Sequence, residues 1–171
     1  MLFFKRAPKP IVRSSVDVLR DLVHAELRLD VAQDEDTARI VVAVAGLLAS
    51  VAYADRVYGE AEQTYARDAL SRLEGLTDAG VDAICEVLRE HGRQIAAQNP
   101  QAFTRELRER TEVELRREVL TVLVDLAAAD GELSLAETDL LRRTTSALGL
   151  TPDDYLHAQA QHRDKLTLLN R

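Results

Sequence analysis

Hydrophobic residues recur with helical spacing through most of this chain. Between residues 15 and 29, Leu19, Leu22 and Val23 fall on one face of a helix. The stretch 40–54 is apolar on nearly every side, which is typical of a helix at the centre of a bundle. No segment alternates between apolar and polar residues for long enough to form a strand. The pattern therefore predicts an all-α protein.

Capping and breaking residues divide this pattern into separate helices. Ser134 and Thr151 can cap the free N–H groups of a helix start, Pro100 suits a first helical position, and Gly149 suits a left-handed helix stop. Gly92 is predicted to end the fourth helix. We predict helices over 15–29, 36–54, 59–73, 78–92, 100–107, 111–129 and 134–148, and an eighth that Thr151 caps, with Pro152 at its first position.

An acidic turn occurs twice along the chain. In each copy an Asp ends an alanine-rich apolar run and a Glu follows after the same interval. The pairs are Asp55 with Glu62 and Asp130 with Glu137, so the two Asp and the two Glu have the same separation along the chain. Gly-Leu-Thr also repeats, at nearly that separation. We therefore predict a single compact bundle of about seven or eight helices, built from two pseudo-repeated helical hairpins.

Composition supports helices and gives one indication of compartment. Aromatic residues make up 4% of the chain, Trp is absent, and seven Gly and four Pro leave little material for the turns of a sheet protein. The single Cys85 cannot form an internal disulfide, which is typical of a reducing compartment. We predict that Cys85 packs in the core and that the protein is cytoplasmic.

Charge is distributed unevenly. Residues 1–13 carry four cations and no acid, and we predict that they form a basic arm beside a domain over residues 14–171. The whole chain has a net charge of −7, so that domain is strongly acidic and nucleic acid is not an expected partner. The arm can make at most a weak contact with an anionic membrane surface.

The N-terminus lacks the apolar segment of a signal peptide, because cations follow the first four residues. The stretch 40–54 would extend about 22 Å as a helix, which is short of the roughly 30 Å hydrocarbon core. We predict a buried helix there and no membrane span.

The acidic turns allow two interpretations. From Asp130 onward the sequence copies the second half of a calcium-binding EF-hand loop, but the two earlier ligand positions would be Leu126 and Ala128, which cannot bind a cation. Alternatively, Ser134 and Glu137 have the spacing of a capping box. If the two hairpins pack about a pseudo-twofold axis, the four carboxylates can converge and bind Ca²⁺ or Mg²⁺.

The segments AAADGELSLAE and LLRRTTSALGL resemble the second half of the TerB-like tellurite-resistance family, which is also seen in the N-terminal region of DjlA-type membrane co-chaperones. AYADRVYGEAE is similar to the first acidic element of that family, with Arg56 in place of its usual Gly. The resemblance covers roughly residues 37–160. It implies an all-helical, TerB-like domain without an established catalytic mechanism, and a divalent metal site at Asp55, Glu62, Asp130 and Glu137.

The sequence gives little support for a zinc site, a catalytic nucleophile or a phosphate-binding loop. The four His residues lack metal-binding spacing and have no Cys partners for zinc, and no nucleophile turn or phosphate-binding Gly loop is present. The three tyrosines around the first acidic turn, Tyr53, Tyr58 and Tyr65, are expected to pack at the hairpin junction. We expect a non-enzymatic stress-response module that binds a divalent metal. The alternative is a protein–protein scaffold or adaptor with an acidic surface and no metal site.

Overall fold

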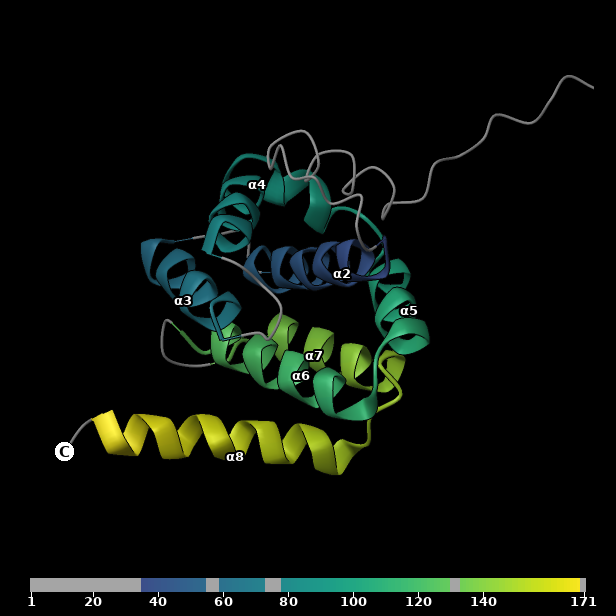
Figure 1. The fold of residues 1–171 in the computed structure, drawn as a ribbon. Helices are drawn as coiled ribbons and strands as arrows, with labels where there is room; N and C mark the ends of the chain where they lie inside the picture. Colours follow the sequence, from purple (N-terminus) through teal and green to yellow (C-terminus); the bar gives the residue numbers. More distant parts are fainter. Residues whose placement is uncertain (1–34, 55–58, 73–77, 130–132, 170–171) are drawn as a thin grey trace, which may run out of the picture.

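The computed structural model describes residues 35–54, 59–72, 78–129 and 133–169, with most of their side chains (Figure 1). These residues form helices and no strand, which confirms the predicted all-α class. The predicted arm and the predicted helix over 15–29 lie outside the described residues. The helices are α2 (Glu35–Ala52), α3 (Glu60–Leu70), α4 (Asp78–Ala96), α5 (Pro100–Arg110), α6 (Val113–Ala127), α7 (Leu135–Ala147) and α8 (Pro152–Leu169).

Helix α2 is the centre of the bundle. It contacts α4, α5, α6 and α7, and residues 42–52 are all buried, which explains why its sequence is apolar on every side. A Cβ at Gly46 would lie 2.6 Å from the ring of Phe103, so this glycine allows α5 to approach α2 closely. Among the described residues, no helix is both long enough and apolar enough to cross a membrane.

The predicted end of α4 at Gly92 is wrong, because the helix continues to Ala96. Gly92 instead lies beneath the ring of Tyr53, where a Cβ would be far inside van der Waals contact. The Tyr53 hydroxyl donates a hydrogen bond to the Leu88 carbonyl oxygen at 3.3 Å. The glycine is therefore a packing residue between the end of α2 and α4. Cys85 on the same helix is half-buried, and burial raises the pKa of its thiol.

Helix boundaries follow the predicted signals in the second half of the chain. Asn99 accepts a hydrogen bond from the backbone N–H of Gln101 and caps α5, with Pro100 at the first position. Gly149 has a φ of 72°. The N–H of Leu150 donates back to the carbonyl of Thr145, so α7 ends in a Schellman motif.

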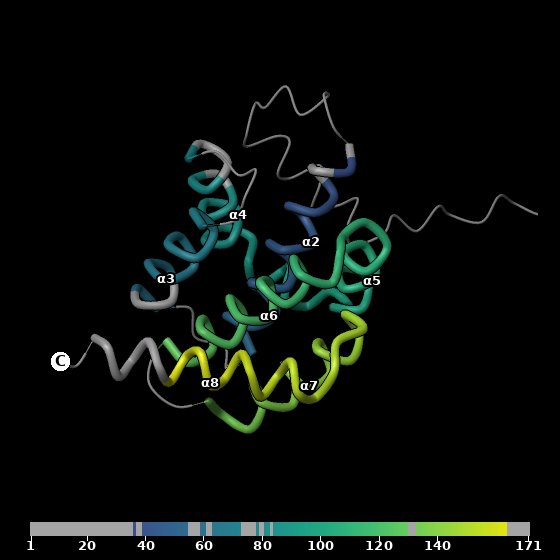
Figure 2. The backbone as a smooth tube through the Cα atoms, turned by 60° about the horizontal axis from the view of Figure 1, so that its bottom comes forward, coloured from purple at the N-terminus to yellow at the C-terminus, as the bar shows by residue number. Residues whose placement is uncertain are grey.

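The internal repeat extends further than the two hairpins that the sequence predicts. Helices α2, α3 and α4 correspond in order to α6, α7 and α8, with α5 connecting the two units (Figures 1 and 2). Helix α2 packs on α4 as α6 packs on α8, and α3 packs on α4 as α7 packs on α8. Contacts between the units are also reciprocal, since α3 contacts α6 and α7 contacts α2. Each unit is thus a set of three helices.

Candidate functional site

The structure describes one of the four predicted metal-ligand side chains. Asp55 and Asp130 lie outside the described residues. Glu62 lies in the first turn of α3, but its side chain is not described. Glu137 lies in the first turn of α7 and is 5% exposed. The structure therefore describes the side chain of one of the four predicted ligands, and the four-carboxylate site stays a prediction.

Glu137 forms the capping box that its spacing with Ser134 predicts. Its Oε2 accepts a hydrogen bond from the Ser134 backbone N–H at 2.7 Å. The Ser134 Oγ accepts one from the Glu137 N–H at 3.2 Å. Two N–H groups that the start of α7 would otherwise leave without partners are thus satisfied. The second carboxylate oxygen of Glu137 retains its lone pairs, so the cap does not use the whole ligand capacity of the side chain.

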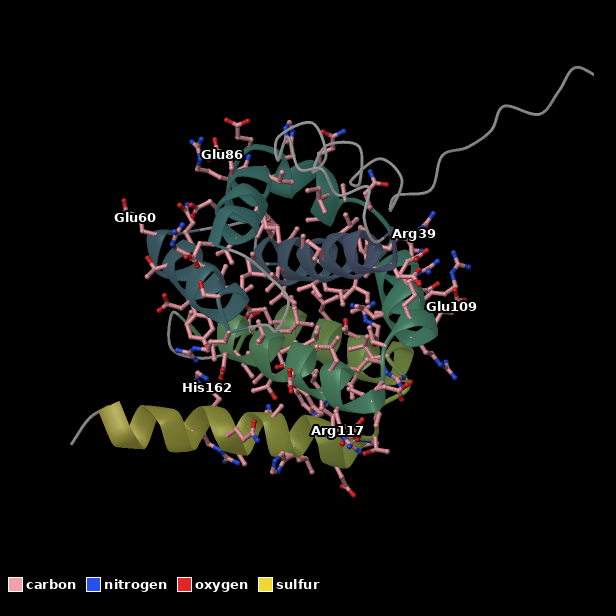
Figure 3. All side chains as sticks on the ribbon, viewed as in Figure 1. Arg39, Glu60, Glu86, Glu109, Arg117 and His162 are labelled. Atoms are coloured by element: carbon pink, nitrogen blue, oxygen red, sulfur yellow. The ribbon has the colours of Figure 1, made fainter. Side chains whose placement is uncertain are left out.

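The helices that lead into the two acidic turns run in the same direction across the bundle. Helix α2 starts against α5, where Arg39 pairs with Glu106 at 3.3 Å. In Figure 3, Arg39 and Arg117 mark the starts of α2 and α6 on the α5 side, and His162 lies toward the other side. Both helices end toward α3, and α7 begins near the end of α6 (Figure 1). The chain therefore enters both acidic turns from the same side of the bundle.

Within the described part of the chain, the side chains do not form a complete metal site. No three His, Cys, Asp or Glu side chains placed there come close enough together to hold a metal ion. The predicted site includes Asp55, Glu62 and Asp130, whose side chains lie outside the described residues.

A different acid, Asp125, occupies a buried position on α6. Its carboxylate lies 2.8 Å from Nδ1 of His162 on α8, with side-chain exposures of 3% and 13%. It also accepts a hydrogen bond from the hydroxyl of Tyr65 on α3. Burial raises the pKa of Tyr65 above its ordinary value, and the hydrogen bond and negative charge of Asp125 add to that effect. One carboxylate thus connects three helices.

His162 has one ring nitrogen without a hydrogen bond. Its Nε2 is buried and has no partner among the described residues. A histidine held at Nδ1 by a carboxylate has a fixed ring orientation, which is a common arrangement for a ring that binds or transfers something at Nε2. Within the described residues, no group of His, Cys, Asp and Glu side chains that could hold a metal ion includes His162, so we assign this pair to the packing of α8.

Two further polar contacts join α6 to α8. Nε of Arg117 lies 2.8 Å from Oδ1 of Asp154, and the Thr121 hydroxyl lies 3.3 Å from Oε1 of Gln161. Asp154 also caps α8 by accepting hydrogen bonds from the backbone N–H and the hydroxyl of Thr151. These bonds and Arg117 lower the pKa of Asp154 to about 2. Directed polar contacts therefore help to attach α8, in addition to the burial of Tyr155 and Ala158 in the core.

A pocket of about 230 Å³ lies between α3, α6 and α8, next to this network. Its lining is mostly apolar, with Ala69 and Val122 among the lining residues. Asp125 and Tyr65 also line it. No motif in the sequence predicts this pocket.

The sequence contains one usable signal for the Asp125 network. Asp125 interrupts the apolar run LTVLVDLAAAD, and a carboxylate on the buried side of a helix requires a partner. The partner could not be found from spacing, because His162 lies 37 residues away and Tyr65 belongs to the other unit. The sequence predicts packing alone for Tyr65, and the structure adds its hydrogen bond.

A family model described as tellurite resistance protein TerB matches residues 41–160 of the chain. The match includes α3 to α7 entirely, most of α2 and the first half of α8. No curated protein and no solved structure matches the chain.

Proposed function

Since the chain belongs to the tellurite resistance protein TerB family, we propose that it is a non-enzymatic, cytoplasmic stress module that binds a divalent cation. The cation would be Ca²⁺ or Mg²⁺, held at the acidic turns by Asp55, Glu62, Asp130 and Glu137. These hard cations take oxygen ligands from carboxylates and turn carbonyls, which is the chemistry that these turns offer.

The observation that carries the proposal is the common direction of α2 and α6. Both helices end on the side of the bundle where α3 lies (Figures 1 and 2), and α6 contacts both α2 and α3. Two turns that begin at the same side can contribute ligands to one ion, whereas turns at opposite sides cannot. The buried carboxylate of Glu137 lies in the first turn of α7, which follows the second acidic turn.

Calorimetric titration with Ca²⁺, Mg²⁺ and Zn²⁺ tests the proposal directly. Wild type should release or absorb heat with Ca²⁺ or Mg²⁺ and unfold at a higher temperature in its presence, because a ligand that binds the folded state stabilises it. Asp55→Asn and Asp130→Asn should each weaken binding at least tenfold. Asp139→Asn, an exposed acid further along α7, is the matched control and should bind as wild type does.

Two substitutions of Glu137 separate metal binding from helix capping. Glutamine can still accept the Ser134 N–H, so Glu137→Gln should retain the cap while removing one negative charge. Glu137→Ala removes both the cap and the negative charge. The proposal expects both variants to lose cation affinity, and only the alanine variant to lose about 1 kcal/mol of stability. Unchanged cation affinity in Glu137→Gln would remove this residue from the site.

The adaptor alternative has its own supporting observation, since Glu137 already has a structural role in the capping box. In that case the turns serve only to start helices, and the acidic surface binds other proteins. Absence of heat and of a thermal shift for wild type with all three cations would favour this second function. Cross-linking of the wild-type chain should then capture a partner whose binding depends on exposed acids such as Glu60 and survives Glu137→Gln.

A further inference from the structure

The pocket between α3, α6 and α8 has opposite charges among its lining residues. Arg72, just after the end of α3, and Glu118, on α6, are both exposed and both line it. Neither forms an ion pair with another residue in the described ranges. Each therefore offers its charge to a ligand.

The other polar groups in the lining are already occupied. Asp125 is bound by Tyr65 and by His162, so its carboxylate is held in place as part of the pocket wall. Thr121 and Gln161, which also line the pocket, are hydrogen-bonded to each other. The lining groups left to recognise a charged ligand are the guanidinium of Arg72 and the carboxylate of Glu118.

Size and polarity restrict the ligand further. At about 230 Å³, the pocket is smaller than the roughly 300–1,000 Å³ of sites for drug-sized ligands. It cannot enclose a nucleotide or a peptide. Its largely apolar lining, which includes Ala69 and Val122, suits a short hydrocarbon group. The ligand should be a small molecule with an apolar body and both a negative and a positive group.

We propose that this pocket binds a free amino acid. Arg72 binds its carboxylate, Glu118 binds its ammonium group, and its aliphatic side chain lies against Ala69 and Val122. A guanidinium pairs well with a carboxylate in a two-bond geometry, and a carboxylate accepts hydrogen bonds from an ammonium. The two charges come from different repeat units, so a bound zwitterion would connect the end of α3 to α6. This site is separate from the proposed cation site and does not depend on it.

The test titrates the full chain with L-leucine, N-acetyl-L-leucine and L-leucine methyl ester, with calorimetry and ¹H–¹⁵N NMR as readouts. The acetylated compound lacks the ammonium group, and the ester lacks the carboxylate. Wild type should bind L-leucine with a Kd below about 1 mM and each blocked derivative at least tenfold more weakly. Shifted NMR signals should include Ala69 and Val122. Equal binding of all three compounds, or no binding of L-leucine, would overturn the proposal.

Variants of the two charged residues complete the test. Arg72→Gln and Glu118→Gln should each weaken L-leucine binding about tenfold, which is the lower range for a charge-assisted hydrogen bond. Arg105→Gln and Glu109→Gln are matched controls on α5, where Figure 3 shows Glu109 far from α8. They should bind as wild type does. Unchanged binding in both pocket variants would refute the assignment, and the blocked leucines give the answer on wild type if a variant fails to fold.

Discussion

The helix pairs α2–α4 and α6–α8 occupy corresponding places in the two repeat units, yet they are held together differently. By the spacing of the acidic turns, Asp125 corresponds to Ser50, which is buried and bonds to the carbonyl of Gly46 on its own helix. By the spacing of the Gly-Leu-Thr repeat, His162 corresponds to Leu88, which is 1% exposed. The first unit thus places a small polar residue and a leucine where the second places a carboxylate and an imidazole.

Corresponding helix pairs can therefore be stabilised by two different kinds of interaction. An apolar contact such as that of the buried Leu88 is stabilised by the area removed from water and tolerates small shifts. A buried Asp–His pair has a required distance and direction, and it is costly when one partner is missing. The α6–α8 pair should consequently be more specific and more fragile than the α2–α4 pair.

His162→Leu, which places the leucine of the first unit in the second, should cause the greatest loss of stability. It leaves the Asp125 carboxylate buried with Tyr65 as its partner, which should cost about 3–5 kcal/mol of unfolding free energy. Urea denaturation followed by circular dichroism measures it. A loss below about 1 kcal/mol would show that the pair does not hold α8.

The double variant Asp125→Ser with His162→Leu tests whether the two interfaces are interchangeable. It installs the pair of the first unit, and the new serine can bond to the carbonyl four residues earlier, as Ser50 does. Because a buried pair of polar side chains can often be replaced without loss when both partners are removed together, the stability of the double variant should lie within about 1 kcal/mol of wild type. A double variant as unstable as His162→Leu alone would mean that each interface needs its own residues.

The next effect in size concerns a contact that only the first unit makes. Gly92→Ala should force the ring of Tyr53 to move and weaken its bond to Leu88, at a cost of about 1–2 kcal/mol after the helix propensity gained by alanine. Thermal unfolding measures the loss. In a protein that already carries Tyr53→Leu, Gly92→Ala should cost much less stability, because the ring that the new Cβ would meet is gone. An unchanged loss in the Tyr53→Leu protein would mean that contact with Tyr53 does not cause the loss.

A smaller effect comes from the starts of α3 and α7. Gly59 in the first unit corresponds to Ser134 in the second, by the spacing of the acidic turns. Ser134→Ala should cost about 1 kcal/mol because its capping oxygen is lost, whereas Ser134→Gly should cost only a few tenths. Thermal unfolding of the two variants tests this order. Equal losses would mean that the hydroxyl contributes little.

The sequence was sufficient for the fold class and for most helix boundaries because those depend on local chemistry. Ser134, Pro100 and Gly149 act on the residues beside them, and each marks a boundary in the structure. The prediction for Gly92 was wrong because the role of this glycine depends on Tyr53, which packs on it from outside α4. The residues around Gly92 do not distinguish a glycine that ends a helix from a glycine that allows another side chain to pack closely.

The candidate sites show the same limit. The capping role of Glu137 depends on a residue three positions away and was predictable. The Asp125 network joins residues from α3, α6 and α8, so its partners depend on how the helices pack. The pocket beside it arises between the same three helices and has no motif at all. Sequence spacing reveals contacts within a helix or turn, whereas the Asp125 network and the pocket lie between helices.

The smallest expected loss of stability is that of a variant at Asp154, and this loss should depend on pH. Asp154 joins α6 to α8, whereas the corresponding positions in the first unit are Gly80 and, for its partner Arg117, Val42. Because the pKa of Asp154 is lowered to about 2 in the folded protein, its contribution is present above pH 4 and is lost as the pH falls toward 2. Asp154→Asn should cost about 0.5 kcal/mol at pH 6, as is typical of exposed ion pairs.

Urea denaturation at pH 6, 4 and 3 should show the difference between Asp154→Asn and wild type shrinking as the pH falls. The exposed neighbour Asp153, as Asp153→Asn, should show a smaller difference throughout. A difference that persists unchanged at pH 3 would mean that Asp154 holds α8 by its shape and neutral hydrogen bonds. The α6–α8 contact would then resemble the α2–α4 contact more than its charges suggest.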